Sequence, residues 1–212
     1  MIDYVTIIKG INMIKKQITF TESKLTFKNH EIDSLSRKKI YQILQTDEKC
    51  YCEKMWENKL GHKLCDLTWT NIFCATKETK LQDFQWKVVH NIFPTNILLN
   101  RMGIKNSENC DLCGVAEFVE HMFFDCKRLS NFWKRVESLL RTMMNKNISL
   151  NKYNVILGVE QDENLRSLNK KEIYMINEIL IIAKLSISKS KAMETNLEIT
   201  FERELRIRNK LI

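Results

Sequence analysis

The feature that most constrains this chain is a set of four metal-ligating side chains within seventeen residues. Cys110, Cys113, His121 and Cys126 follow the spacing Cys-x2-Cys-x7-His-x4-Cys. Zn²⁺ takes thiolate and imidazole ligands in tetrahedral structural sites, which commonly start from a Cys-x2-Cys turn. Gly114, directly after that turn, lets the backbone fold back under an ion. We expect a structural Zn²⁺ site, because four protein ligands leave no coordination position for a substrate.

Two other interpretations of the cysteines stay open. In the first, the three cysteines of the set are ordinary buried free thiols, and His121 lies beside them by chance. Cys50, Cys52, His62 and Cys65 form a looser second candidate, although Cys-x-Cys is less usual for zinc and ordinary thiols are the favoured interpretation. Seven cysteines without an evident signal peptide favour a reducing compartment, cytoplasmic or nuclear.

Composition predicts a mainly α, multi-helix domain around a small Cys3His zinc knuckle. The chain has 212 residues, 44% hydrophobic and 28% charged, which is ordinary globular composition with enough chain for a core. One Pro and five Gly favour helices over a turn-rich β architecture. Alternation over 18–20 and 25–27 predicts one short N-terminal β-hairpin. No apolar run is long enough to cross a membrane, so we expect no membrane association.

Apolar spacing and capping residues predict three parts. These are a poorly defined N-terminal segment (1–34), a helical zinc-binding domain (35–160) and a C-terminal helical extension (161–212). Ser36 and Thr95 are expected N-caps, and a short element should end at Gly158. Periodicity predicts helices at about 36–44, 49–60, 67–73, 77–91, 96–101, 127–146, 169–191 and 195–212.

The helix after Cys126 combines an apolar stripe with a basic arc. Its predicted buried positions are Leu129, Phe132, Trp133, Val136, Leu139, Leu140 and Met143. At 3.6 residues per turn, the opposite arc gathers Lys127, Arg128, Lys134, Arg135 and Arg141. We expect Trp133 to pack the knuckle against the helical core. The arc is either a solvated face or a surface for a polyanion such as RNA or single-stranded DNA.

A second group of cations lies at the end of the predicted 169–191 helix. Lys184, Lys189 and Lys191 complement the helix dipole there and are candidates for phosphate contacts, in a chain of net charge +8. Ile173, Ile176, Ile179, Leu180, Ala183 and Ile187 should face the core of the same helix. Trp86 and Phe123 are candidate platforms for stacking on unpaired bases.

The run Phe84-Gln-Trp-Lys-Val-Val-His-Asn-Ile-Phe-Pro-Thr-Asn96, the Cys/His tetrad and Phe132-Trp133 resemble a known family. It is the reverse-transcriptase zinc-binding domain, found near the C-terminus of LINE-type (non-LTR) retrotransposon polyproteins. The stretch 177–191 looks like the segment that follows it in animal LINE elements. The resemblance implies Zn²⁺, a role in holding template RNA or target DNA, and the polymerase portion of such a polyprotein as a partner.

The chain lacks the motifs of the enzymes it might be compared with. It has no Tyr-x-Asp-Asp motif, no Gly-rich phosphate loop and no Gly-x-Ser-x-Gly elbow. We predict a zinc-stabilised nucleic-acid-binding module without catalytic activity of its own. The alternatives are a zinc-stapled helical scaffold that binds an acidic protein, and a truncated copy of such an element without a present role.

Overall fold

The computed structural model of the chain describes residues 18–21, 24–27, 30–31, 35–40, 51–64, 66–159 and 168–208. The chain divides into two compact units, Met1–Lys54 and Met55–Ile212. The predicted domain boundaries after residues 34 and 160 stay predictions. The functional questions concern the second unit, because it contains the Cys/His tetrad.

The first unit contains a small antiparallel sheet in the order β1-β2-β3, formed by β1 (Ile18–Thr21), β2 (Lys24–Phe27) and β3 (His30–Glu31). Ile18 pairs with Phe27 across β1 and β2, so the predicted hairpin is confirmed. Ser36 Oγ accepts a hydrogen bond from the Lys39 backbone N–H at 3.3 Å, as expected of an N-cap. Residues 37–40 are helical as predicted, and the remainder of that predicted helix, 41–44, lies outside the described residues.

From α3 onward the described chain is mainly helical, which confirms the predicted fold class. The helices are α3 (Tyr51–Leu60), α4 (Asp66–Cys74), α5 (Thr79–Val89), α6 (Asn96–Arg101), α7 (Ser130–Met144), α8 (Lys152–Leu157), α9 (Lys170–Met193) and α10 (Leu197–Ile207). Thr95 caps α6 as predicted, and Asn169 caps α9 in a reciprocal pair with Glu172. Among the helices described, none is both long and apolar enough to cross a membrane.

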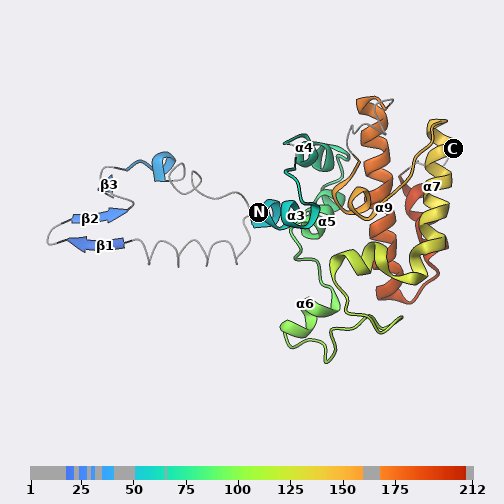
Figure 1. The fold of residues 1–212 in the computed structure, drawn as a ribbon, viewed down its shortest axis with the longest axis horizontal. Helices are drawn as coiled ribbons and strands as arrows, with labels where there is room; N and C mark the ends of the chain where they lie inside the picture. The colour runs from blue at the N-terminus through green and yellow to red at the C-terminus, as the bar shows by residue number, and fades with distance from the viewer. Residues whose placement is uncertain are drawn as a thin grey trace. The chain divides into compact units, whose positions relative to one another are not determined.

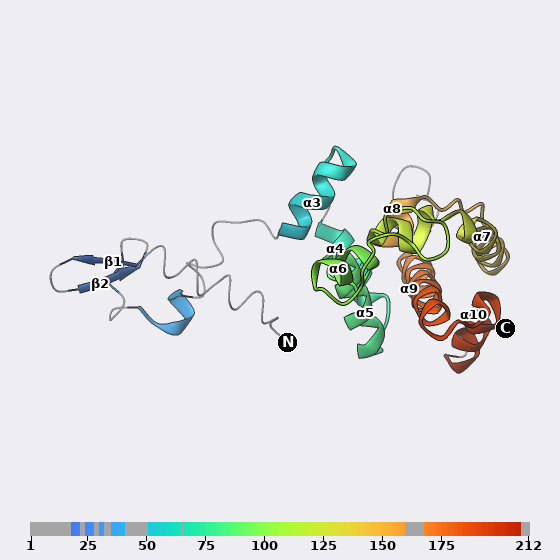
Figure 2. The same ribbon diagram turned by 90° about the horizontal axis from the view of Figure 1, so that it is seen from below.

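Helix α9 is the central element of the second unit. It packs against α4, α5, α7 and α10 (Figures 1 and 2). All six predicted core positions of this helix are buried, and so are Ile181 and Ile182. A helix that is apolar on nearly every side belongs in the interior of a domain. Burial of this kind gives the unit a hydrophobic core that is independent of the cysteines.

An aromatic cluster joins α5 to the tetrad region. Phe84 and Phe93 meet edge to face with ring centroids 5.2 Å apart, and Phe123 completes the cluster at 5.9 and 5.3 Å from them. Such arrangements favour rings at an angle to one another and add to the burial energy. We call residues 96–126 the knuckle lobe; α6 and the loop after it lie at one end of the unit (Figure 1).

Candidate metal centre

A tight loop brings Cys110 and Cys113 to the same place. Asn109 and Ala116 form an isolated antiparallel bridge that closes the loop. Inside it, the Cys110 N–H donates to Val115 O at 2.7 Å, and the Gly114 N–H donates to Cys110 O at 2.9 Å. Gly114 has φ +73°, a conformation that glycine adopts without steric cost, so its predicted role in turning the backbone is confirmed.

A π-helical turn, η2 (His121–Asp125), supplies the other two candidate ligands. In an α-helix, residues five apart point about 140° away from each other, so His121 and Cys126 would not share an ion. Here the Cys126 N–H bonds to His121 O at 3.1 Å, which widens the turn by one residue. The 3₁₀ turn η3 (Lys127–Leu129) follows and leads into α7.

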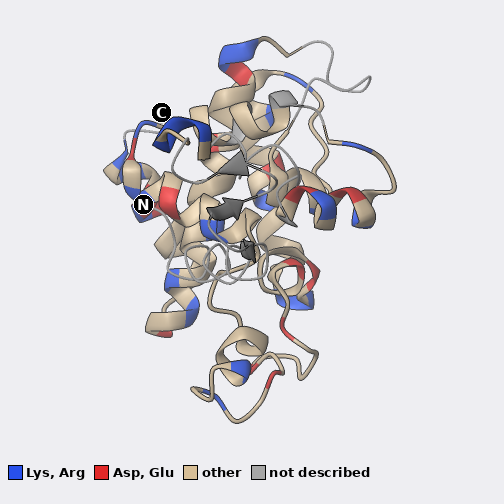
Figure 3. Cartoon of the chain, turned by 90° about the vertical axis from the view of Figure 1, so that its left-hand side faces the viewer, with Lys and Arg blue, Asp and Glu red and all other residues tan. Residues whose placement is uncertain are grey.

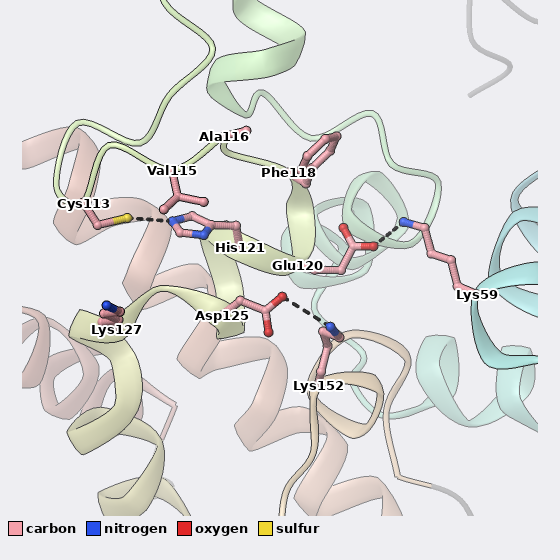
Figure 4. A pocket seen from close by; sticks show the side chains of 10 residues that line it. All are labelled: Lys59, Cys113, Val115, Ala116, Phe118, Glu120, His121, Asp125, Lys127 and Lys152. Atoms are coloured by element: carbon pink, nitrogen blue, oxygen red, sulfur yellow. Dashed lines mark hydrogen bonds and ion pairs between the residues drawn. The ribbon is translucent and has the colours of Figure 1, made fainter.

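The structure brings together all four residues predicted as metal ligands. Their ligand atoms lie within 4.8 Å of one another. Cys113 Sγ lies 3.1 Å from His121 Nε2 and 3.9 Å from Cys126 Sγ (Figure 4 shows the first contact). Tetrahedral Zn²⁺ with bonds of about 2.3 Å to sulfur separates two sulfur ligands by about 3.8 Å, so the spacing of Cys113 and Cys126 fits. The group can hold a metal ion.

No second group of three or more metal-ligating side chains occurs in the part of the chain that the structure describes. Cys50 and Cys65, half of the looser second candidate, lie outside the described residues. That hypothesis is therefore untested.

Two of the cysteines differ in acidity because their surroundings differ. Burial raises the pKa of Cys110 to about 11. A hydrogen bond from the Val115 backbone lowers the pKa of Cys113. Metal binding requires thiolates and releases their protons. The free energy cost of deprotonation is therefore largest at Cys110, where a bound cation would have to offset it.

A buried carboxylate attaches the knuckle lobe to α9. Glu117 is 1% exposed, and its side chain accepts from the Asn96 N–H at 3.0 Å and from Lys191 Nζ at 2.5 Å. Asn96 Nδ2 in turn donates to Asn109 O at 2.6 Å, at the base of the cysteine loop. The predicted phosphate role of Lys191 needs correction, because its charge is taken up inside the protein.

Trp133 packs against the turn that carries His121 and Cys126, as expected. Its Nε1 donates to Phe123 O at 2.9 Å, and its ring meets that of Phe132 at 5.4 Å. Phe123 is fully buried, so its predicted role as a stacking platform is wrong. Trp86 is half-buried, with His90 4.4 Å from its ring.

Lys184 is the clearest correction among the predicted phosphate contacts. Its side chain is 1% exposed and donates to Gln85 Oε1 at 2.6 Å and to Ile156 O at 3.2 Å. Burial lowers the pKa of Lys184 to about 7. Lys189 remains partly exposed, but its charge pairs with the buried Glu204 at 2.8 Å. Neither lysine presents a free charge to a phosphate.

The predicted basic arc is only partly free. Arg135 pairs with Glu198 of α10 at 2.7 Å, and Arg141 donates to Ile148 O at 2.7 Å. Lys and Arg are spread over several elements and interleaved with Asp and Glu (Figure 3). The remaining members of the arc are exposed and have no ion pair with any residue the structure describes; we call them the knuckle cations: Lys127, Arg128 and Lys134.

The helix itself begins at Ser130, after the 3₁₀ turn, and so starts later than predicted. Leu129, Phe132, Trp133, Val136 and Leu140 are buried as expected. Leu139 and Met143 are only half-buried, and Met144 takes the buried place at the end of the stripe. The short 3₁₀ segment shifts the phase of the helix relative to a regular α-helix counted from Lys127.

Residues 35–133 match the family model for zinc-binding in reverse transcriptase. The predicted resemblance is confirmed over this stretch, which contains the whole tetrad. The LINE-type setting stays a prediction. No curated protein matches the chain.

Sequence reasoning missed a group of residues beside the tetrad. Lys59 of α3, Phe118 and Lys152 of α8 line a cavity with Cys113 and His121 (Figure 4). Phe118 lies between Glu117 and Val119, which are both buried, and is itself exposed. Nothing in the local sequence distinguishes it from a core phenylalanine. The two lysines carry no local signal either, because α3 and α8 lie far from the tetrad in sequence.

Proposed function

We propose that the chain is a zinc-stabilised nucleic-acid-binding module that holds RNA for a reverse transcriptase. Three findings support the proposal: the family match over 35–133, the Cys3His group, and the exposed knuckle cations next to it. The LINE-type polyprotein is the proposed setting, and its polymerase portion the proposed partner. The module carries out no catalytic step of its own.

The proposed metal is Zn²⁺, held by Cys110, Cys113, His121 and Cys126. Three thiolates and one imidazole are a donor set that favours Zn²⁺, whereas Mg²⁺ and Ca²⁺ bind oxygen ligands. The bound ion would fix the loop and the π turn to each other. Four protein ligands leave no position for a reacting water, so its role is structural.

The observation that carries the nucleic-acid proposal is the position of the knuckle cations. Lys127 and Arg128 directly follow the last candidate ligand, and Lys134 lies in the second turn of α7. Five other cations near them are engaged by protein groups: Arg135, Arg141, Lys146, Lys189 and Lys191. Exposed charges without an internal partner are the ones available for phosphates.

A salt series of RNA binding tests this proposal. Each phosphate contact on a single strand contributes about 0.7 to the slope of log K against log salt. Replacing all three knuckle cations with Ala should therefore reduce the slope by about 2. The matched control replaces three exposed cations of other elements, Lys80, Lys171 and Arg203, with Ala and makes the same change in net charge.

The proposal fails if both triple variants lower RNA affinity equally, since the effect would then be one of net charge. It also fails if the native chain binds RNA no better than an acidic peptide and with little salt dependence. That second result would favour the protein-interaction scaffold. Exposed apolar side chains on the knuckle lobe, Met102, Ile104, Leu112, Val115 and Phe118, are the observation on its side.

Zinc is tested separately, by metal analysis. The purified chain should hold one Zn²⁺, and Cys113→Ser should lose it. Stoichiometric zinc in the Cys113→Ser protein would contradict the assignment of ligands.

A further inference from the structure

A cavity of about 610 Å³ opens beside the tetrad, on the side of Cys113 and His121 (Figure 4). Val115, Ala116 and Phe118 give it an apolar wall. Lysines and carboxylates from three other places in the unit complete the lining. A cavity with an apolar wall and a few polar groups is typical of a site for a small, partly aromatic ligand.

Phe118 behaves unlike the other phenylalanines of the unit. Its side chain is 50% exposed, and no other Phe side chain that the structure describes is exposed to this degree. Phe84, Phe93 and Phe123 instead stack on one another in the core. An exposed ring at a cavity wall is available for stacking on a planar ligand.

The charged groups of the cavity are mostly in pairs. Lys59 pairs with Glu120, and Lys152 pairs with Asp125 at 3.3 Å (Figure 4). A carboxylate has about four acceptor sites, so one lysine does not exhaust it. Lys127 is the remaining cation of the lining and one of the knuckle cations. The cavity therefore offers hydrogen-bond acceptors near a ring, with a single unengaged positive charge.

This pattern suits a nucleobase better than a row of phosphates. A row of phosphates would meet two carboxylates and only one unengaged lysine. A base brings a flat aromatic face, an edge with amine donors, and one phosphate on its backbone. Asp and Glu are the side chains that accept from the exocyclic amine of cytosine.

We propose that this cavity binds one unpaired base of a single-stranded nucleic acid. The base stacks on Phe118, its exocyclic amine donates to Glu120 or Asp125, and its phosphate lies near Lys127. This inference rests on the proposed function and adds to it a base-binding position with a preference for bases that carry an exocyclic amine (cytosine, adenine or guanine) over uracil. Val115 belongs to the same apolar wall of the cavity, on the side of Cys113 and His121 (Figure 4).

The first test measures the affinity of the zinc-loaded full chain for short oligocytidylate and for an abasic chain of equal length. The difference between the two isolates the contribution of the bases, because the phosphates are the same. Phe118→Ala should weaken oligocytidylate binding about tenfold and leave abasic binding unchanged. Phe118→Tyr should retain the native affinity. Ile104→Ala, at another exposed apolar residue of the lobe that does not line the cavity, is the matched control and should have no effect.

The second test measures the preference for oligocytidylate over oligouridylate. Glu120→Gln and Asp125→Asn together should reduce that preference about tenfold, since an amide has one acceptor oxygen and adds a donor. Comparing RNA and DNA versions of each oligonucleotide shows whether the cavity takes its base from RNA or from single-stranded DNA. Far-UV circular dichroism and zinc content confirm that each variant is folded.

The two proposals fail differently. If native oligocytidylate binding is salt-dependent but Phe118→Ala does not change it, the base-binding position is wrong and the proposed function stands. If Phe118→Ala and Ile104→Ala weaken binding equally, the effect is one of general surface apolarity, which also overturns the position. If no single strand binds the native chain in a salt-dependent way, the proposed function itself fails.

Discussion

The knuckle lobe and the helices around α9 lie in one unit but are stabilised by different interactions. Side chains of α9 such as Ile176 and Ile179 are fully buried, whereas Ile104 and Leu112 of the knuckle lobe are largely exposed. Val119 and Phe123 at the end of the lobe are buried, but the loop at 102–115 buries no apolar side chain except Cys110 to offset the entropy of ordering its backbone. A metal ion bound by the four candidate ligands, whose ligand atoms lie within 4.8 Å of one another, would supply what burial does not.

The knuckle lobe carries the exposed ring of Phe118 and leads directly into Lys127 and Arg128, two of the knuckle cations. A bound metal ion would hold the backbone of the lobe while apolar side chains such as Met102, Ile104 and Phe118 remain on its surface. Glu117 and Lys191 then fix the lobe to α9 through a buried ion pair. In the proposed module, the α9 core would be the support, and Phe118 of the lobe together with the knuckle cations would be the binding groups.

The largest expected effect is on the free energy of unfolding, and it differs between a variant in α9 and a variant in the knuckle lobe. Ile179→Ala removes a fully buried side chain from α9 and should lower the free energy of unfolding by about 2–5 kcal/mol. His121→Ala should abolish metal binding but leave the main unfolding transition at nearly the same urea concentration. Urea denaturation followed by circular dichroism measures both. The reverse ranking would contradict the distinction between core and lobe.

Two glycines allow a smaller and better-matched comparison. Both have positive φ, +87° for Gly158 and +73° for Gly114. A Cβ at Gly158 would lie 2.9 Å from Asn177 Oδ1, whereas one at Gly114 would meet nothing within 4 Å. Gly158→Ala should cost about 2 kcal/mol of global stability through strain and contact with the buried Asn177. Gly114→Ala should instead weaken metal affinity, with about 1 kcal/mol of local strain.

Equal losses of global stability in Gly158→Ala and Gly114→Ala would contradict the distinction between the core and the knuckle lobe. Thermal denaturation and a metal titration of each protein give the comparison.

The smallest expected effect concerns pH and the core lysine. The folded state lowers the pKa of Lys184 from 10.5 to about 7, so between these values the unfolded chain binds a proton that the folded chain does not. Stability from this group therefore rises with pH across the interval and is lost as pH falls toward 7. The slope is about 1.4 kcal/mol per pH unit.

Other groups titrate in the same range, so the Lys184 contribution is read as a difference between proteins. Between pH 8 and pH 9, Lys184→Met should lack this increment in the free energy of unfolding. Lys171→Met, at an exposed position of the same helix, should keep it. Parallel slopes for the two variants would show that Lys184 is charged in the folded state.

Features encoded locally were predictable from the sequence. The tetrad, the core face of α9 and the Thr95 cap each depend on residue type and short spacing, and the structure has all of them. Ligand spacing and helical period are sufficient for such features because the determining residues are neighbours in the chain.

Pairing between distant residues could not be predicted in this way. Lys184 meets Gln85 across 99 positions, and Lys191 meets Glu117 across 74. A lysine has the same local appearance whether it faces solvent or a buried carboxylate. Lys184 did carry one usable signal, since it lies among Ile182, Ala183 and Leu185 in a helix that is apolar on nearly every side. The sequence alone thus overestimated the number of cations available to phosphates.

The central claim is that a metal ion orders the knuckle lobe while the α9 core is stable without it. Amide hydrogen exchange of the chain, with zinc and after removal of the metal by a chelator, tests this most directly. We expect protection to fall by at least about tenfold at residues 110–126 and to stay nearly unchanged in α9. An equal loss of protection in α9, or no loss at 110–126, would contradict it.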